Sequence, residues 1–240
     1  MRAMKLNRNR NSVGFTLVEL LVVIVIIAAL AALSFTVGPK MLRKAKATEA
    51  MQNLRQLGPV VTAFVTDHEM KLPPAKASAV QSDGVVADLQ WNQVCLGMLF
   101  PDTEPSDLYS KGWWDGNKTM FKNPLFKGST FLNPGYGMNL MIAENIATAA
   151  GGAVPALDVL LATPVPLAAI SEPHRTPLIA PFNNYYFRFD DTELDSFKTP
   201  PLNNLISEGK MPILFLDGHV ELMTSMEYTD RHLAEIPMAP

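Results

Sequence analysis

The chain has 240 residues, a formal net charge of −3 and only 18% charged residues. Four of its 20 basic residues, Arg2, Lys5, Arg8 and Arg10, lie in the first fourteen positions, which hold no acidic residue, so 16 basic residues face 23 acidic ones in the rest. An acidic surface of this kind argues against nucleic acid as a partner. Cys95 is the only cysteine, which excludes an intrachain disulfide.

The chain begins with a basic leader, residues 1–14, followed by an apolar run from Phe15 to Val37. A helix over this run is about 34 Å long, enough to cross a bilayer core of about 30 Å. The positive-inside rule then keeps the leader in the cytoplasm and exports the rest of the chain. Glu19 stands out, because a charged residue at membrane depth costs about 2.5 to 3.5 kcal/mol on insertion scales and is usually functional.

Two simpler interpretations of the run are an ordinary secretory signal and an uncleaved membrane anchor. Ala29-Leu30-Ala31 offers a plausible small-residue cleavage site for a signal. The length of the run and the acid at Glu19 argue against the signal, since its hydrophobic region needs neither. The simple anchor remains an alternative.

The segment Gly14-Phe15-Thr16-Leu17-Val18-Glu19, with the apolar residues after it, resembles the class III signal of type IV prepilins and type II secretion pseudopilins. The resemblance implies that prepilin peptidase cleaves between Gly14 and Phe15 and methylates the new amine of Phe15. It also implies that Glu19 pairs with the N-terminal ammonium of a neighbouring subunit. A carboxylate in hydrocarbon would then find its counter-charge only when subunits pack side by side, and a lone subunit would carry it unpaired.

The helix is expected to continue through residues 38–68 as an amphipathic half, with Pro39 and Gly58-Pro59 bending it rather than ending it. A stripe of apolar residues recurs at spacings of three and four, which predicts one buried helical face. Its members are Ala47, Ala50, Leu54, Leu57, Val61 and Phe64. Leu72-Pro73-Pro74 should stop the helix, which we expect to reach Asp67 or His68.

A basic patch, Arg43, Lys44 and Lys46, lies just outside the predicted span. Cations on the exported side depart from the simple positive-inside pattern. We expect this patch to touch lipid headgroups or neighbouring subunits.

Residues 69–240 are expected to form one exported, loop-rich domain. Short helical turns are predicted over Ala75–Val80 and Val85–Leu99, and Trp113 and Trp114 are expected to pack in a core or interface rather than to form a ligand-stacking platform. The apolar stretch Ile146–Ile170 predicts either a buried loop with a helical turn or a contact surface. Short strands are predicted over Thr176–Ala180 and Asn184–Phe189.

Near the C-terminus, Asp217-Gly218 separates two apolar segments and predicts a type I′ hairpin over residues 211–223. Asp217 beside His219 suggests an acid-base pair, but a turn aspartate that caps its own hairpin is the more common situation. The predicted cross-strand pairs are Phe215 with Val220 and Ile213 with Leu222 on a core face, and Leu216 with His219 and Leu214 with Glu221 on the other.

The segment Ile213–Val220, with its Asp217-Gly218-His219 hairpin signature, is similar to a large bacterial family of prepilin-like proteins, as are residues 135–139 and 170–176. That family carries a His, nine residues and then Asp-Gly near its C-terminus. This chain has Ser207 at the His position, which puts in doubt any role of that His, such as metal binding.

No zinc, nucleotide or hydrolase motif is present in the sequence. The acidic cluster Asp190, Asp191, Glu193 and Asp195 offers oxygen ligands that suit Ca²⁺, and some major pseudopilins bind calcium near their C-terminus. A solvated loop is the favoured interpretation, so no cofactor is expected.

The sequence therefore predicts an α+β, pilin-like fold: a long N-terminal helix packed on a small antiparallel sheet with loop-rich insertions. The expected function is structural rather than enzymatic, a pilin or pseudopilin subunit in the inner membrane that polymerises into a filament. The implied partners are identical or related pilin subunits, prepilin peptidase, the inner-membrane assembly platform and its ATPase. The alternative is a monomeric, membrane-tethered binding domain that uses the signal only for export.

Overall fold

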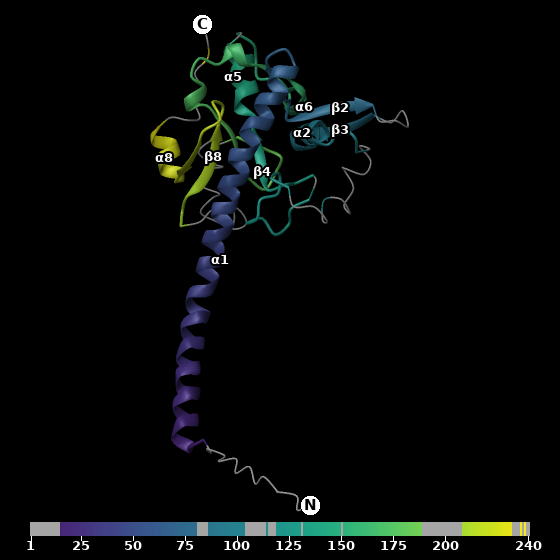
Figure 1. The fold of residues 1–240 in the computed structure, drawn as a ribbon. Helices are drawn as coiled ribbons and strands as arrows, with labels where there is room; N and C mark the ends of the chain where they lie inside the picture. Colours follow the sequence, from purple (N-terminus) through teal and green to yellow (C-terminus); the bar gives the residue numbers. More distant parts are fainter. Residues whose placement is uncertain are drawn as a thin grey trace, which may run out of the picture. The chain divides into compact units, whose positions relative to one another are not determined.

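The computed structural model describes residues 15–80, 86–103, 114, 119–130, 132–149, 151–188, 208–231, 236 and 238. The chain divides into two compact units, residues 1–42 and 43–240. A single helix, α1 (Leu17–Asp67), begins in the first unit and ends in the second (Figure 1).

Helix α1 runs without interruption through Pro39 and through Gly58-Pro59, so neither proline ends it, as expected. It ends at Asp67, within the predicted limits, because Glu69 and Met70 both adopt left-handed backbone conformations, with φ values of 54° and 56°. By length and composition α1 is able to cross a membrane: its most apolar window of 18 residues has a mean hydropathy of 3.0, and none of that window is buried.

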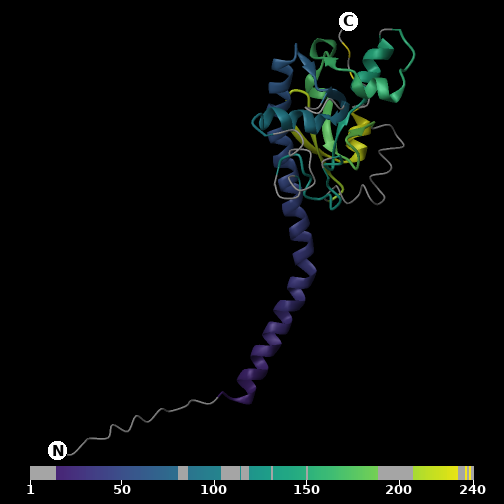
Figure 2. The ribbon, with the colours of Figure 1, turned by 90° about the vertical axis from the view of Figure 1, so that its right-hand side faces the viewer.

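The C-terminal part of α1 lies beside a small sheet in the second unit (Figures 1 and 2). The predicted apolar stripe is confirmed there, because Leu54 and Leu57 are fully buried and Val61 and Phe64 nearly so. The Tyr136 hydroxyl donates to the Ala50 carbonyl at 3.2 Å and ties the helix to the sheet.

The sheet has five strands in the order β7-β4-β6-β8-β9, and all pairings are antiparallel except that of β4 with β7. The long helix and mainly antiparallel sheet confirm the predicted α+β, pilin-like arrangement. The two predicted strands are present, although the second is only two residues long. The strands are β4 (Tyr136–Asn139), β6 (Pro177–Pro181), β7 (Tyr186–Phe187), β8 (Met211–Phe215) and β9 (Val220–Met223).

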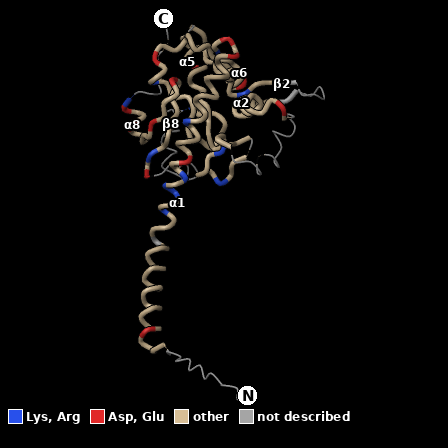
Figure 3. Tube along the Cα trace, viewed as in Figure 1, with Lys and Arg blue, Asp and Glu red and all other residues tan. Residues whose placement is uncertain are grey.

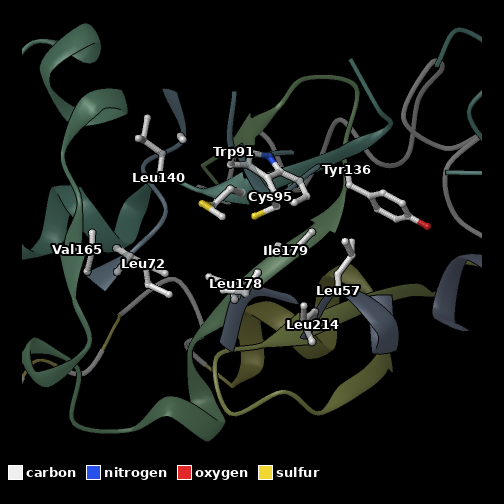
Figure 4. Packing of buried hydrophobic residues seen from close by; sticks show 14 of the residues in the cluster. Leu57, Leu72, Trp91, Cys95, Tyr136, Leu140, Val165, Leu178, Ile179 and Leu214 are labelled. Carbon is white, nitrogen blue, oxygen red and sulfur yellow. The ribbon is translucent and has the colours of Figure 1, made fainter. Parts of the chain in front are cut away.

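Every residue of β8 is buried. Because successive residues of a strand point to opposite sides, both faces of β8 are therefore covered. Leu214 belongs to a large cluster with Leu57 of α1 (Figure 4). Trp114 is buried in this cluster, as expected, whereas Trp113 lies outside the described residues. Ile213 and Phe215 belong to a second cluster, which includes Tyr228 of the short helix α8 (Ser225–Asp230). The large cluster includes Trp91, Cys95, Trp114, Phe121, Leu178 and Ile179.

The helical turn predicted over Ala75–Val80 is wrong. This segment contains strand β2 (Lys76–Val80), which pairs with β3 (Val86–Gln90). Among the described residues of the second predicted segment, Val85–Leu99, only Trp91–Leu99 is helical, as α2. Side-chain contacts of Asp88 in β3 also link the two strands. Its carboxylate accepts a hydrogen bond from Ser78 Oγ at 3.0 Å and forms an ion pair with Lys76 Nζ at 2.6 Å. The cross-strand partner decides the conformation, and local propensity does not reveal it.

The apolar stretch Ile146–Ile170 combines both predicted characters. Leu160 and Leu161 of helix α6 are buried, whereas Val154 and Val159 are half exposed. The remaining elements between the core strands are short. They are α5 (Met141–Ala149), α6 (Leu157–Ala162), β5 (Val165–Pro166), which pairs with β1 (Lys71–Leu72), and the 3-10 turns η1 (Leu167–Ala169) and η2 (Pro173–Arg175).

Candidate functional site

Glu19 lies in the first turn of α1, where Thr16 precedes the helix. The backbone N–H and the hydroxyl of Thr16 both donate to Oε2 of Glu19 at 2.8 Å, and the Glu19 N–H donates to Thr16 Oγ1 at 3.2 Å. This reciprocal arrangement is a capping box, which satisfies backbone donors that the start of a helix leaves without partners.

The capping box changes the expectation for a lone subunit. Glu19 is hydrogen-bonded within its own chain through Oε2, and within the described residues its Oε1 accepts no hydrogen bond. Thr16 is a functional residue that the prepilin resemblance does not point to, although Thr16-Leu17-Val18-Glu19 carries the spacing that is typical of a capping box.

The apolar part of α1 presents its side chains outward. Phe15 is 83% exposed, and each large apolar residue from Leu17 to Leu33 is at least 45% exposed. Figure 3 shows this stretch as a tube without charge after Glu19. A continuous apolar surface of this extent requires lipid or protein to cover it. Gly14 lies outside the described residues, so cleavage between Gly14 and Phe15 stays a prediction.

The hairpin β8–β9 has a three-residue loop rather than the predicted two-residue type I′ turn. The Gly218 N–H donates to the Phe215 carbonyl at 3.0 Å, and the Phe215 N–H donates to the His219 carbonyl at 2.9 Å. Gly218 has a φ of +91°, as expected for a type I turn followed by a glycine bulge.

The longer loop shifts the predicted register by one residue, so all four predicted pairs are wrong. Leu214 pairs with Val220 and Ile213 with Glu221, and Leu222, expected in the core, is 42% exposed opposite Pro212. The physical reason is non-local: the Leu216 N–H donates to the carbonyl of Thr176 at 2.9 Å, which keeps Leu216 out of the hairpin ladder.

Asp217 and His219 interact directly at the hairpin tip. Oδ1 of Asp217 accepts from the His219 backbone N–H at 3.1 Å and lies 2.6 Å from its Nδ1. Partial burial acts to raise the pKa of Asp217, but the hydrogen bonds from His219 outweigh it and hold the pKa below its ordinary value. The His219 ring stacks on Phe215, with centroids 4.4 Å apart. These contacts favour the turn-capping role for Asp217.

The hairpin tip packs against the C-terminal half of α1 at a glycine. A Cβ at Gly58 would lie 3.5 Å from both the Cα and the carbonyl oxygen of Gly218. This is an ordinary van der Waals distance, so a Cβ at Gly58 would just touch the turn. The backbones of the helix and of the Asp-Gly turn therefore lie close together at this point.

Residues 9–35 match the family described as the prokaryotic N-terminal methylation motif. This chain carries a prepilin-type N-terminal signal. Comparison with curated proteins and with solved structures found no match. The resemblance of the C-terminal hairpin to prepilin-like proteins therefore remains a prediction.

Beside the hairpin lies an open pocket of about 430 Å³. Its cations are paired: Arg231 makes two bonds of 2.7 Å to Glu221, and Arg175 donates to Glu172 and to the Arg231 carbonyl, both at 3.1 Å. The hydrogen bond from Arg231 lowers the pKa of Glu221. The network joins η2 to the end of α8. The pocket is lined by His174, Arg175, Phe215, His219, Glu221 and Arg231.

Within the part of the chain that the structure describes, no group of three or more His, Cys, Asp or Glu residues is arranged to hold a metal ion. The calcium candidates Asp190, Asp191, Glu193 and Asp195 lie outside the described residues, as does Ser207. Calcium binding by the acidic cluster and the consequence of Ser207 therefore remain predictions from the sequence.

Proposed function

We propose that this chain is a structural pilin or pseudopilin subunit that polymerises into a type II secretion pseudopilus or a type IV pilus-like filament. The observation that carries the proposal is the match of residues 9–35 to the methylation motif on a helix whose apolar side chains are exposed. Prepilin peptidase would cleave between Gly14 and Phe15 and methylate the Phe15 amine. The proposal assigns no catalytic residue to the chain.

The capping box suggests how Glu19 serves two states of the subunit. In a membrane monomer, Thr16 holds Oε2 of Glu19 with two hydrogen bonds of 2.8 Å. Its other oxygen, Oε1, is then the acceptor available to the Phe15 ammonium of a neighbouring subunit. A charge-assisted bond in apolar surroundings is strong, because little solvent competes with it. Glu19 would thereby fix the register of one helix against the next.

Assembly would replace lipid by protein around the apolar part of α1. The monomer would span the inner membrane once, with its leader in the cytoplasm and residues 43–240 on the exported side. The assembly platform and its ATPase would move it from the bilayer into the filament. The exported unit would then form the outside of the filament.

Mass spectrometry of the mature N-terminus tests the processing step. The expected product begins with a methylated Phe15. An N-terminus near Ser34 would identify an ordinary secretory signal and overturn the proposal.

Substitution of Glu19 tests the assembly step. Glu19→Leu is expected to insert in the membrane but to lose filament formation, measured by sedimentation and subunit cross-linking. Glu19→Gln separates charge from capping, because glutamine is able to keep a capping box but cannot pair with an ammonium. We expect it to fail as well. Glu49→Leu, at an exposed acid outside the apolar run of the same helix, is the matched control and should assemble.

The alternative is a membrane-tethered binding domain, which the open pocket near His174 and His219 would favour. Such a protein should be indifferent to Glu19→Leu. Normal cross-linking and localisation of that variant would support the tethered domain over the filament subunit.

A further inference from the structure

Four cations follow the apolar part of α1 within seven residues. Lys40, Arg43, Lys44 and Lys46 form a basic collar that contains no acidic residue, and no charge lies between Glu19 and Lys40. Figure 3 shows the charge pattern along the helix: one acid near its start, an uncharged stretch, and then a group of basic residues. The collar therefore begins where the hydrocarbon-compatible sequence ends.

Three of the four cations of the collar are exposed, and Lys46 is partly buried. Lys40, Arg43 and Lys44, at spacings of three and four residues, share one face of α1 and are exposed. The Lys44 side chain is 72% exposed, although Glu208 lies 3.9 Å from it. An exposed ion pair of this length contributes little, so it leaves Lys44 able to exchange partners.

Two apolar residues lie between these cations. Met41 and Leu42 are 68% and 60% exposed, so the same turn presents both charge and hydrocarbon. Long Lys and Arg side chains suit such a boundary, because their stems lie along apolar material while the charges reach the polar headgroups.

We propose that the basic collar binds the headgroups of anionic phospholipids at the exported face of the membrane. The inference rests on the proposed membrane insertion of α1. An anionic surface attracts juxtamembrane Lys and Arg, and each cation increases the association by about fivefold near that surface. A monomer meets these headgroups at once, whereas it meets an acidic neighbour only after assembly.

Processing gives the collar a second consequence. Arg2, Lys5, Arg8 and Arg10 leave with the leader, so the cations that flank the span on the cytoplasmic side are lost. The collar is then the basic cluster beside the span. It would hold the processed monomer at the exported face until the assembly machinery withdraws it.

The test places the purified full chain, as a monomer, in nanodiscs that contain zwitterionic phosphatidylcholine and anionic phosphatidylglycerol. A fluorophore on Met41→Cys reports quenching by brominated versions of either lipid, and Cys95 does not compete for the label because it is fully buried. The ratio of the two quenching curves gives the relative association constant of the anionic lipid at the collar.

The expected ratio favours phosphatidylglycerol severalfold and falls at high salt. Lys40→Gln with Lys44→Gln should lower it severalfold, towards unity. Lys127→Gln with Lys210→Gln removes the same charge from exposed positions in the exported unit and should leave the ratio unchanged.

Equal quenching by the two lipids, or an equal preference in the two double variants, would overturn the proposal. The lipid measurement does not depend on filament formation, and Glu19→Leu must keep the lipid preference while losing assembly. If the collar variant assembles poorly although monomeric chains show no lipid preference, the collar binds a neighbouring subunit and the lipid proposal fails.

Discussion

The two halves of α1 show how one helix meets two different requirements. In the half that ends near Leu42, large apolar side chains face outward on every side. In the half that begins at Arg43, apolar residues form one stripe and the fully buried Leu54 and Leu57 pack within their own unit. A helix that is apolar all round requires an apolar environment on every side. A helix with a single apolar stripe needs only its own domain to bury that stripe. The first half is therefore built for a partner that the second half does not need.

The largest expected difference between the halves is in the free energy of unfolding that is lost when a leucine is replaced by alanine. Leu57→Ala should destabilise the unit of residues 43–240 by about 2 to 5 kcal/mol, because it leaves a cavity in a closed core. Leu21→Ala, in the exposed half, should change that free energy of unfolding by less than about 0.5 kcal/mol. Denaturant unfolding in detergent, followed by tryptophan fluorescence, measures both. A similar loss in the two variants would show that the halves do not differ in this way.

A smaller effect is expected at the start of the exposed half. Thr16→Ala removes the hydroxyl of the capping box and should cost the first turn of α1 about 1 kcal/mol. Assembly should weaken, because Glu19 is then less well held, while unfolding of the exported unit should not change. Thr16→Ser keeps the hydroxyl and should assemble normally. Failure of Thr16→Ser would mean that the threonine methyl group, not the cap, is needed.

The smallest effect is expected at Gly58, in the striped half. Gly58→Ala should raise stability by up to about 1 kcal/mol, because alanine favours the helix and its Cβ fits at 3.5 Å from Gly218. Gly58→Leu is the contrasting variant, since a larger side chain must displace the hairpin tip and should destabilise the unit. Thermal unfolding distinguishes them, and a destabilised alanine variant would contradict the contact described at Gly218.

Regular patterns in the sequence predicted the helix well. The spacing from Ala50 to Phe64 located the buried face, and Leu72-Pro73-Pro74 placed the end near Asp67. Both signals are local, because helical periodicity repeats within a few residues. The capping partner of Glu19 is an equally local signal, because Thr16 lies three residues before it in the sequence.

The sheet was harder to predict, because distant residues decide it. The hairpin register depends on the bond from Leu216 to Thr176, and strand β2 depends on Asp88 of β3. The Asp-Gly dipeptide correctly located the turn but was compatible with two loop lengths. For the candidate site, the sequence singled out Glu19 and favoured a turn-capping Asp217, and the assembly role of Glu19 stays a prediction. The pocket near His219 could not be predicted, because it is formed by four separate segments.

The buried position of Cys95 gives the unit of residues 43–240 a reporter of its own folding. Burial raises the pKa of its thiol to about 12, so at neutral pH the group is neither ionised nor accessible to reagents. Thiol modification would then occur only in chains that have opened this core, and its rate would measure opening without any substitution. In an oxidising compartment, the same burial would protect folded chains from forming disulfide-linked dimers.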